Sequence, residues 1–123
     1  MEESRKNERR APNDYYLVFD RENDRFIGRV LNMSLDGVLL VSMEPVEVSG
    51  IFHCIMALPE KIDDCNQIVF DAESKWSRKN ESSNMYETGY RFKNISKTDR
   101  GIVRELLQRW LTVQSSSLSS WTH

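Results

Sequence analysis

Short apolar runs separated by polar segments occupy the middle of the chain. Residues 15–19 read YYLVF and residues 26–33 read FIGRVLNM, and the polar residues 20–25 between them favour a hairpin. Four similar runs follow at 38–42, 51–58, 67–76 and 85–92. Aromatic and β-branched residues in runs of this length are typical of strands. The pattern therefore predicts about six short strands, and the acidic segment that begins at Pro59 is expected to be a loop.

A helical period replaces the strand pattern after residue 95. Ser96 is a good N-cap, and Asp99 follows three residues later in a variant of the capping box. Apolar side chains then recur at helical spacing, at Ile102, Val103, Leu106, Leu107, Trp110 and Leu111. We expect this helix to end near Val113 and to pack its apolar stripe on the strands. The alternative is that the stripe forms part of a homodimer interface.

The two ends of the chain differ from its middle. Residues 1–13 contain almost nothing that could be buried and are expected to form a flexible basic arm. Residues 114–123 are rich in serine and are expected to be a disordered tail. Residues 14–113 then form one domain. Small antiparallel sheets often close, which removes their exposed edges. We therefore predict a mainly all-β fold, a six-stranded antiparallel β-barrel with a C-terminal α-helix that covers one end or one face.

Composition narrows the class of protein. The chain has 123 residues, of which 39% are hydrophobic and 29% charged, as in a soluble globular domain. No apolar run approaches the ~20 residues of a membrane helix, and the first ten residues lack the apolar stretch of a secretory signal. Cys54 and Cys65 fit no zinc or redox motif and are expected to be reduced thiols. We therefore expect a cytoplasmic protein without membrane insertion.

Charge is distributed unevenly. The net charge is −2, but residues 4–10 read SRKNERR, with four cations and one anion for a local sum of +3. An anionic partner is therefore expected at this end of the chain.

Catalytic chemistry has little support in the sequence. The two histidines are His53, inside an apolar run, and His123, the last residue. His53 and Cys54 are adjacent on a predicted strand and should point to opposite faces, which does not suit a nucleophile–base pair or a shared metal. We find no glycine-rich phosphate loop either. We expect no enzymatic activity, no metal site and no cofactor.

Two short motifs flank the predicted hairpin. Arg5 and Arg9 have an RxxxR spacing in the arm, ahead of the first strand. Asn32, Ser34 and Gly37 have an NxSxxG spacing at the end of the second strand and its turn. Each motif alone is weak evidence, but the two in this order are specific.

This pairing resembles the PilZ domain family, the bacterial receptors for cyclic di-GMP. The resemblance covers most of the chain, because Trp76 at a strand end, the run GYRF at 89–92 and the following helix also match in order. It implies a PilZ-type β-barrel with a ligand on its outer surface and the arm folded over that ligand. We expect Trp76 and Trp110 to pack in the core or between barrel and helix.

The resemblance also implies a set of ligand-binding residues. Guanine presents O6 and N7 side by side, which suits an arginine fork, and guanidinium groups pair well with phosphates. Asn32 and Ser34 are two apart and should point to the same side of a strand. Gly37 permits a positive φ, a tight turn and close approach of the ligand. The predicted ligand site comprises Arg5, Arg9, Arg10, Asn32, Ser34 and Gly37, with Arg10 as the substitute for Arg9.

The implied function is a cyclic di-GMP receptor or adaptor that converts ligand binding into ordering of its arm and altered protein interactions. The downstream partner protein is not specified by the sequence. One alternative is a small nucleic-acid-binding barrel, which the net charge of −2 and the lack of a second basic stripe oppose. The other is a PilZ domain that acts as a protein-interaction adaptor without binding nucleotide.

Overall fold

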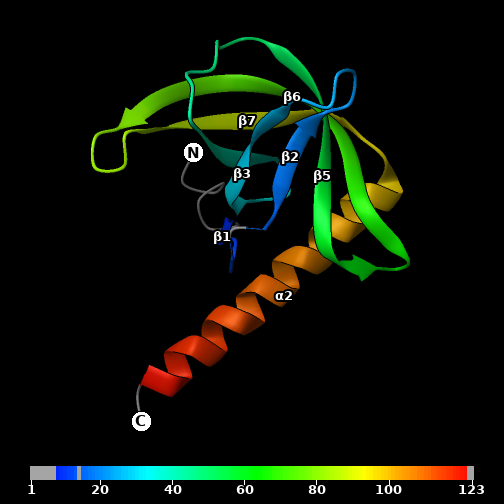
Figure 1. Cartoon of the computed structure of the whole chain (residues 1–123). Helices are drawn as coiled ribbons and strands as arrows, with labels where there is room; N and C mark the ends of the chain where they lie inside the picture. Colours follow the sequence, from blue (N-terminus) through cyan, green and yellow to red (C-terminus); the bar gives the residue numbers. More distant parts are fainter. Residues whose placement is uncertain (1–7, 14, 122–123) are drawn as a thin grey trace.

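The computed structural model describes residues 8–13 and 15–121, and the side chains of these residues as far as Leu111. This part of the chain forms seven strands and one helix (Figure 1). In chain order they are β1 (Arg9–Arg10), β2 (Leu17–Asp20), β3 (Phe26–Met33), β4 (Gly37–Ser42), β5 (Ile51–Ile62), β6 (Cys65–Asn80), β7 (Met85–Ile95) and α2 (Lys97–Trp121).

Strands β2 to β7 close into an antiparallel barrel. Their order is β3-β2-β5-β6-β7-β4, and β3 completes the ring by pairing with β4 as well as with β2. The two-residue strand β1 pairs with the end of β3 at Asn32 and Met33, beyond the point where β2 stops. The predicted six-stranded antiparallel barrel with a C-terminal helix is therefore confirmed. The long β6–β7 hairpin extends to one side of the barrel (Figure 1).

The core lies inside the barrel and is supplied by alternate positions of each strand, because successive side chains of a strand point to opposite faces. In β7, for example, Thr88, Tyr90 and Phe92 are buried. The central buried side chains from the strands are Val18, Val30, Met33, Leu40, Met56, Ile68 and Phe70.

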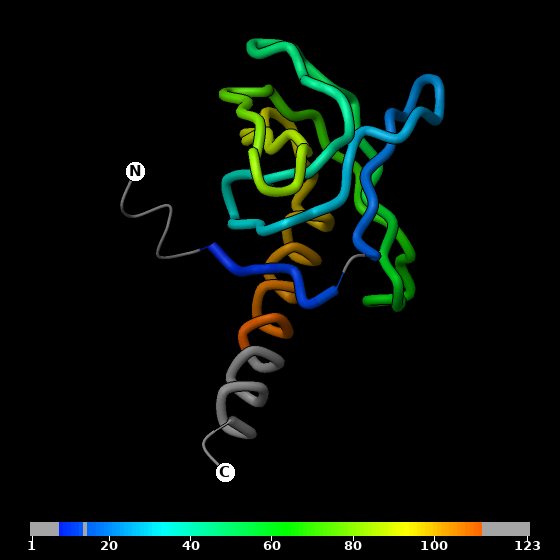
Figure 2. The backbone as a smooth tube through the Cα atoms, turned by 60° about the vertical axis from the view of Figure 1, so that its left-hand side comes forward, coloured from blue at the N-terminus to red at the C-terminus, as the bar shows by residue number. Residues whose placement is uncertain are grey.

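Helix α2 covers one end of the barrel. The Ser96 hydroxyl accepts a hydrogen bond from the Asp99 backbone N–H at 3.0 Å, so the predicted N-cap is present. The buried face of the helix comprises Ile102, Val103, Leu106 and Trp110. Figure 2 shows α2 passing beneath the barrel. No helical stretch within residues 8–13 and 15–121 has the length and apolar character needed to cross a membrane.

Two predicted boundaries are wrong. Helix α2 continues to Trp121, beyond the end that we expected near Val113. No glycine or proline follows Gly101, and serine costs a helix no more than ~0.7 kcal/mol per residue, so nothing in the sequence stops the helix. The acidic segment after Pro59 is not a loop, because β5 and β6 meet at a tight turn in which Asp63 and Asp64 have φ values of 52° and 65°.

A polar cluster joins the β2–β3 turn to β5 and β6. Arg21 Nη2 donates to Asp71 Oδ1 at 2.7 Å, and His53 Nδ1 lies 2.7 Å from the same oxygen. Cys54 points into the core, so His53 and Cys54 lie on opposite faces, as predicted. The pKa of Asp71 is lowered, mainly by the hydrogen bond with His53 and also by Asn94 and Arg21.

We expect Asp71→Asn to reduce the free energy of unfolding at neutral pH and to have little effect in acid. A carboxylate whose pKa is lowered by folding contributes its full stability above the ordinary aspartate pKa of about 3.9, and loses it as the pH falls through the folded value. Urea unfolding of both proteins across this range measures the difference. Glu81→Gln, in the exposed β6–β7 turn, is the control. A wild-type-to-variant difference that stays constant with pH contradicts this account.

Candidate ligand-binding site

The NxSxxG segment forms a tight turn between β3 and β4. The Ser34 backbone N–H donates to the Gly37 carbonyl at 2.9 Å, and the Ser34 hydroxyl accepts from the Asp36 N–H at 3.2 Å. From β7, the Phe92 N–H donates to the Asp36 carbonyl at 2.8 Å. Ser34 is only 7% exposed, so its hydroxyl serves the turn and offers little surface to a ligand.

Gly37 has a different role from the one we expected. No glycine of the chain has a positive φ, so the turn does not use the conformational freedom of Gly37. A β-carbon at Gly37 would instead collide with the backbone carbonyl oxygen of Tyr90 and would lie 3.1 Å from the Arg91 Cα. Glycine at this position therefore allows β4 and β7 to pack closely and sets the position of the turn.

Strand β1 separates the two described arginines of the predicted site. Arg10 lies directly opposite Asn32, and Arg9 directly opposite Met33. Because residues opposite each other in an antiparallel pair share a face, Arg10 lies on the face of Asn32, and Arg9 lies on the other face with the buried Met33. Arg5 lies outside the described residues. The predicted flexible arm thus contains a strand at Arg9 and Arg10, and the structure brings Arg10, not Arg9, to Asn32.

The face that carries Arg10 continues around the outside of the barrel. Asn32 is opposite Leu39, Leu39 is opposite Gly89, and Gly89 is opposite Trp76. We call Arg10, Asn32, Leu39, Gly89 and Trp76 the outer row. The outer row crosses β1, β3, β4, β7 and β6. Neighbouring strands lie about 4.8 Å apart, so the path along the barrel wall from Asn32 to Trp76 is about 14 Å long.

Trp76 forms the far end of the outer row as an exposed, flat aromatic surface. Its side chain is 42% exposed and lies over Gly89, where a β-carbon would collide with the indole ring. The Arg78 guanidinium carbon lies 5.3 Å from the ring centroid, in a cation–π contact. The expected packing role is confirmed for Trp110, which is 1% exposed, and is wrong for Trp76. The exposure of Trp76 could have been predicted from its position opposite Gly89, but that pairing depends on strand register, which the local sequence does not show.

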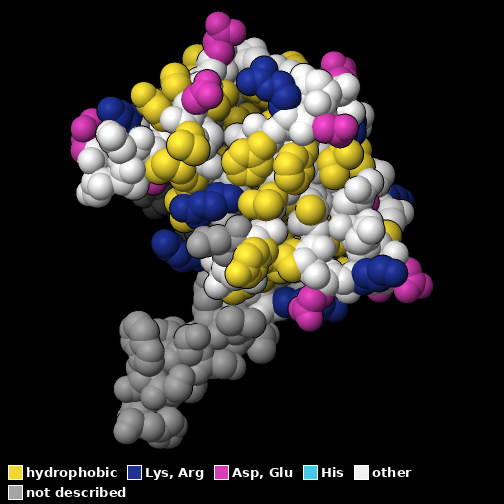
Figure 3. Space-filling view, viewed as in Figure 1, with side chains coloured by type: hydrophobic (Ala, Val, Ile, Leu, Met, Phe, Trp, Pro, Cys, Tyr) yellow, Lys and Arg dark blue, Asp and Glu magenta, His cyan; other side chains and the backbone are white. Residues whose placement is uncertain are grey.

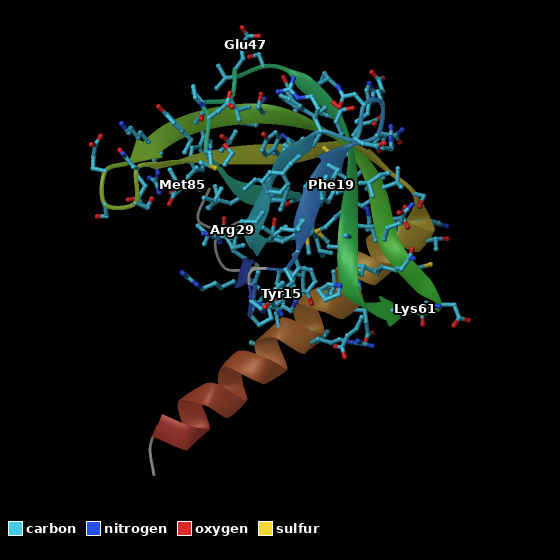
Figure 4. All side chains as sticks on the ribbon, in the orientation of Figure 1. Tyr15, Phe19, Arg29, Glu47, Lys61 and Met85 are labelled. Carbon is cyan, nitrogen blue, oxygen red and sulfur yellow. The ribbon has the colours of Figure 1, made fainter. Side chains whose placement is uncertain are left out.

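A second outer row lies two positions along β4, β6 and β7 from the first, and three along β3, where the register with β4 shifts between Val30 and Asn32. Arg29 is opposite Val41, Val41 opposite Glu87, and Glu87 opposite Arg78. Glu87 accepts hydrogen bonds from Asn80 Nδ2 and Arg78 Nη2, both at 3.0 Å, and these bonds lower its pKa, with the bond from Asn80 the larger cause. Glu87 therefore holds Arg78 beside Trp76. Arg29 lies on the surface of the barrel in Figure 4.

Together the two rows place charged and aromatic side chains around a centre of small or apolar residues. Arg10 and Asn32 stand at one end of the outer row, Leu39 and Gly89 in the middle, and Trp76 at the other end. Figure 3 shows hydrophobic side chains gathered over the middle of one face of the barrel, with lysine and arginine side chains beside them. Such a surface suits a ligand with anionic groups and flat rings. No group of side chains suited to a metal ion occurs in the described part of the chain.

Comparison with known proteins agrees with this architecture. The sequence profile of the PilZ domain matches residues 3–112. A search of curated proteins gives no match. Among solved structures, the Bacillus subtilis inhibitor of motility (MotI/DgrA) has a TM-score of 0.66 at 19% identity, covering 89% of this chain and 50% of that one.

Two further similar structures contain cyclic di-GMP. The K. pneumonia MrkH–c-di-GMP complex has a TM-score of 0.68 at 14% identity, covering 89% of this chain and 52% of that one. The PilZ domain with c-di-GMP of YcgR from Escherichia coli has a TM-score of 0.62 at 15% identity, covering 94% of both chains. The chain thus spans about half the length of the inhibitor of motility and of MrkH, and at these identities the likeness shows the fold.

The profile match covers nearly the whole chain, and the barrel, the closing helix and the turn at 32–37 agree with it. The chain therefore belongs to the PilZ domain family, a family of non-enzymatic receptors for cyclic di-GMP.

Proposed function

We propose that this PilZ domain binds cyclic di-GMP along the outer row. The observation that carries the proposal is the alignment of Arg10, Asn32 and Trp76 on one outer face, across strands that are far apart in the sequence. Cyclic di-GMP has two phosphate charges and two guanines. It therefore offers the anionic groups and flat rings that this face suits. The two similar structures that hold the same ligand, MrkH and YcgR, support this choice.

Each end of the outer row has a separate role in the proposal. The Arg10 guanidinium binds a phosphate or the O6/N7 edge of a guanine, and the Asn32 amide binds a guanine edge or a phosphate oxygen. Trp76 stacks on a guanine, next to the Arg78 guanidinium that contacts its ring. Ser34 and Gly37 shape the turn beside Asn32, and Arg5 remains a predicted ligand contact.

Ligand contact by Arg10 needs little ordering of its backbone. Arg10 already pairs with Asn32, and ordering a residue costs roughly 1–2 kcal/mol of conformational entropy. The arm is therefore partly organised for binding before the ligand arrives. We propose that cyclic di-GMP changes the surface around β1 and the turn at 32–37, and that a downstream protein recognises this change.

Calorimetry of the full chain with cyclic di-GMP tests the proposed function. We expect saturable heat at ligand concentrations on the order of 10–100 µM, and much weaker binding of cyclic di-AMP, because adenine lacks the O6/N7 edge that the arginine fork recognises. A single-stranded oligonucleotide is the control for general nucleic-acid binding. If a folded sample gives no heat with cyclic di-GMP, or binds the oligonucleotide better, the proposal is wrong.

We expect Trp76→Ala to weaken cyclic di-GMP binding by about 5- to 150-fold, because stacking on an aromatic side chain contributes about 1–3 kcal/mol per base. Trp76→Phe retains an aromatic face and should keep most of the affinity. The midpoint of thermal unfolding should change little, because the ring is 42% exposed. Met43→Ala, at another exposed apolar residue, is the control for affinity. Unchanged affinity of Trp76→Ala would remove this residue from the site.

A further inference from the structure

Helix α2 and strand β1 enclose a small cleft next to the turn at 32–37. Its volume is about 150 Å³, and it is lined by Arg9, Leu35, Arg104, Leu107, Gln108 and Leu111. Arg9 belongs to the RxxxR motif and Leu35 to the NxSxxG motif. The cleft is therefore the place where both motifs meet the C-terminal helix.

A hydrogen bond holds the helix against this turn. Arg100 Nη1 donates to the Leu35 carbonyl at 2.9 Å. Arg104 follows four residues later, about 6 Å further along the axis and on the same flank of the helix. The buried side chains of Leu106 and Trp110 anchor the helix to the barrel at the same level. Arg104 is thus directed to the cleft by a fixed helix and not by a loop.

The cleft is cationic. Among the residues that the structure describes, its lining includes Arg9, Arg104 and the amide residue Gln108, and no acidic residue. The Arg104 side chain is exposed and makes no hydrogen bond or ion pair with any residue that the structure describes. On the other flank of α2, Arg109 Nε donates to Glu105 Oε2 at 3.1 Å. The exposed Arg104 guanidinium beside this small cleft favours an anion there, because opposite charges attract.

We infer that Arg104 binds a phosphate group of cyclic di-GMP in this cleft, together with Arg9. This inference rests on the proposed function and adds a residue from α2, outside both motifs, to the site. The cleft is smaller than the ~300 Å³ of the smallest typical ligand pockets, so it takes one group of the ligand and not the whole dinucleotide. Arg10 on one face of β1 and Arg9 on the other then contact different parts of the same ligand.

The test is the affinity of the full chain for cyclic di-GMP, measured by calorimetry at two salt concentrations. We expect Arg104→Gln to weaken binding by about 10- to 100-fold, the usual effect of losing a hydrogen bond to a charged group. The affinity of the variant should also depend less on salt, because one charge contact is gone. Arg104→Lys keeps the charge but loses the two-pronged guanidinium, so its affinity should lie between those of the wild type and Arg104→Gln. Arg109→Gln, on the other flank of α2, is the matched control and should bind like the wild type.

The outcomes separate this inference from the proposed function. If the wild type binds cyclic di-GMP and Arg104→Gln binds equally well with the same salt dependence, the inference is overturned and the proposed function stands. If the wild type does not bind, both are overturned. Thermal unfolding of each variant shows whether a loss of binding comes from loss of the fold, and Arg104→Lys provides a second variant if Arg104→Gln is unstable.

Discussion

Arg10→Glu is expected to reduce the affinity for cyclic di-GMP by more than about 100-fold while leaving the protein folded. The substitution removes a guanidinium contact with a base or phosphate, which contributes about 1–3 kcal/mol, and places a carboxylate where the ligand carries negative charge, which costs several kcal/mol more. Each 1.4 kcal/mol is a factor of ten in affinity. Arg10 is exposed and its backbone still pairs with Asn32 in the variant, so the barrel should keep its fold.

Calorimetry with each purified variant measures this effect. The matched control is Arg25→Glu, the same substitution at an exposed arginine of the β2–β3 turn, away from the outer row. Arg9→Glu tests the other face of β1 and should weaken binding through the cleft beside α2. If Arg10→Glu binds normally and Arg9→Glu does not, the outer row is not the ligand site.

Trp110→Ala is expected to lower the free energy of unfolding by about 3–5 kcal/mol, the range for truncating a large buried aromatic residue. Trp110 is 1% exposed and meets Tyr16 edge to face, with ring centroids 5.0 Å apart, where α2 closes the end of the barrel. A domain of this size has a total stability of about 5–15 kcal/mol, so this one residue supplies a large share. Urea unfolding followed by circular dichroism measures the change.

Two variants of the same helix make this result interpretable. Leu111→Ala, at the next residue, removes a side chain that is 42% exposed and should change stability by no more than about 0.5 kcal/mol. Trp110→Phe leaves a smaller cavity, and it also removes an indole N–H that is buried without a hydrogen-bond partner among the described residues. Trp110→Phe should therefore lower the free energy of unfolding less than Trp110→Ala does. Equal stabilities of Trp110→Ala and Leu111→Ala would contradict the proposed closure of the barrel by this residue.

Several features followed from local sequence alone. The runs of aromatic and β-branched residues predicted where β2 to β7 lie, because such residues favour strands. Ser96 predicted the start of α2, because its hydroxyl can satisfy an N–H of the first turn. The spacings at 5–9 and 32–37 indicated the PilZ family through residues close together in the chain.

The arrangement of the candidate site depended on contacts between distant segments. A slip of one residue in β1 would exchange Arg9 and Arg10 between the two faces, and nothing in the arm itself specifies that register. Trp76 is exposed because it lies on Gly89 of the neighbouring strand, and its own sequence context is equally compatible with a core residue. Arg104 reaches the turn at 32–37 only because Arg100 and the buried face of α2 dock the helix there.

By itself, then, the amino-acid sequence determined the six barrel strands without their exact ends, the start of the helix, the barrel class and the two motifs, since these depend on hydrophobic period, capping and short spacings. Only the tertiary structure decided which arginine shares a face with Asn32, which tryptophan is exposed and which helical residues line the cleft beside the turn at 32–37. The physical reason is that strand register and helix docking are set by packing and hydrogen bonds between residues far apart in the chain.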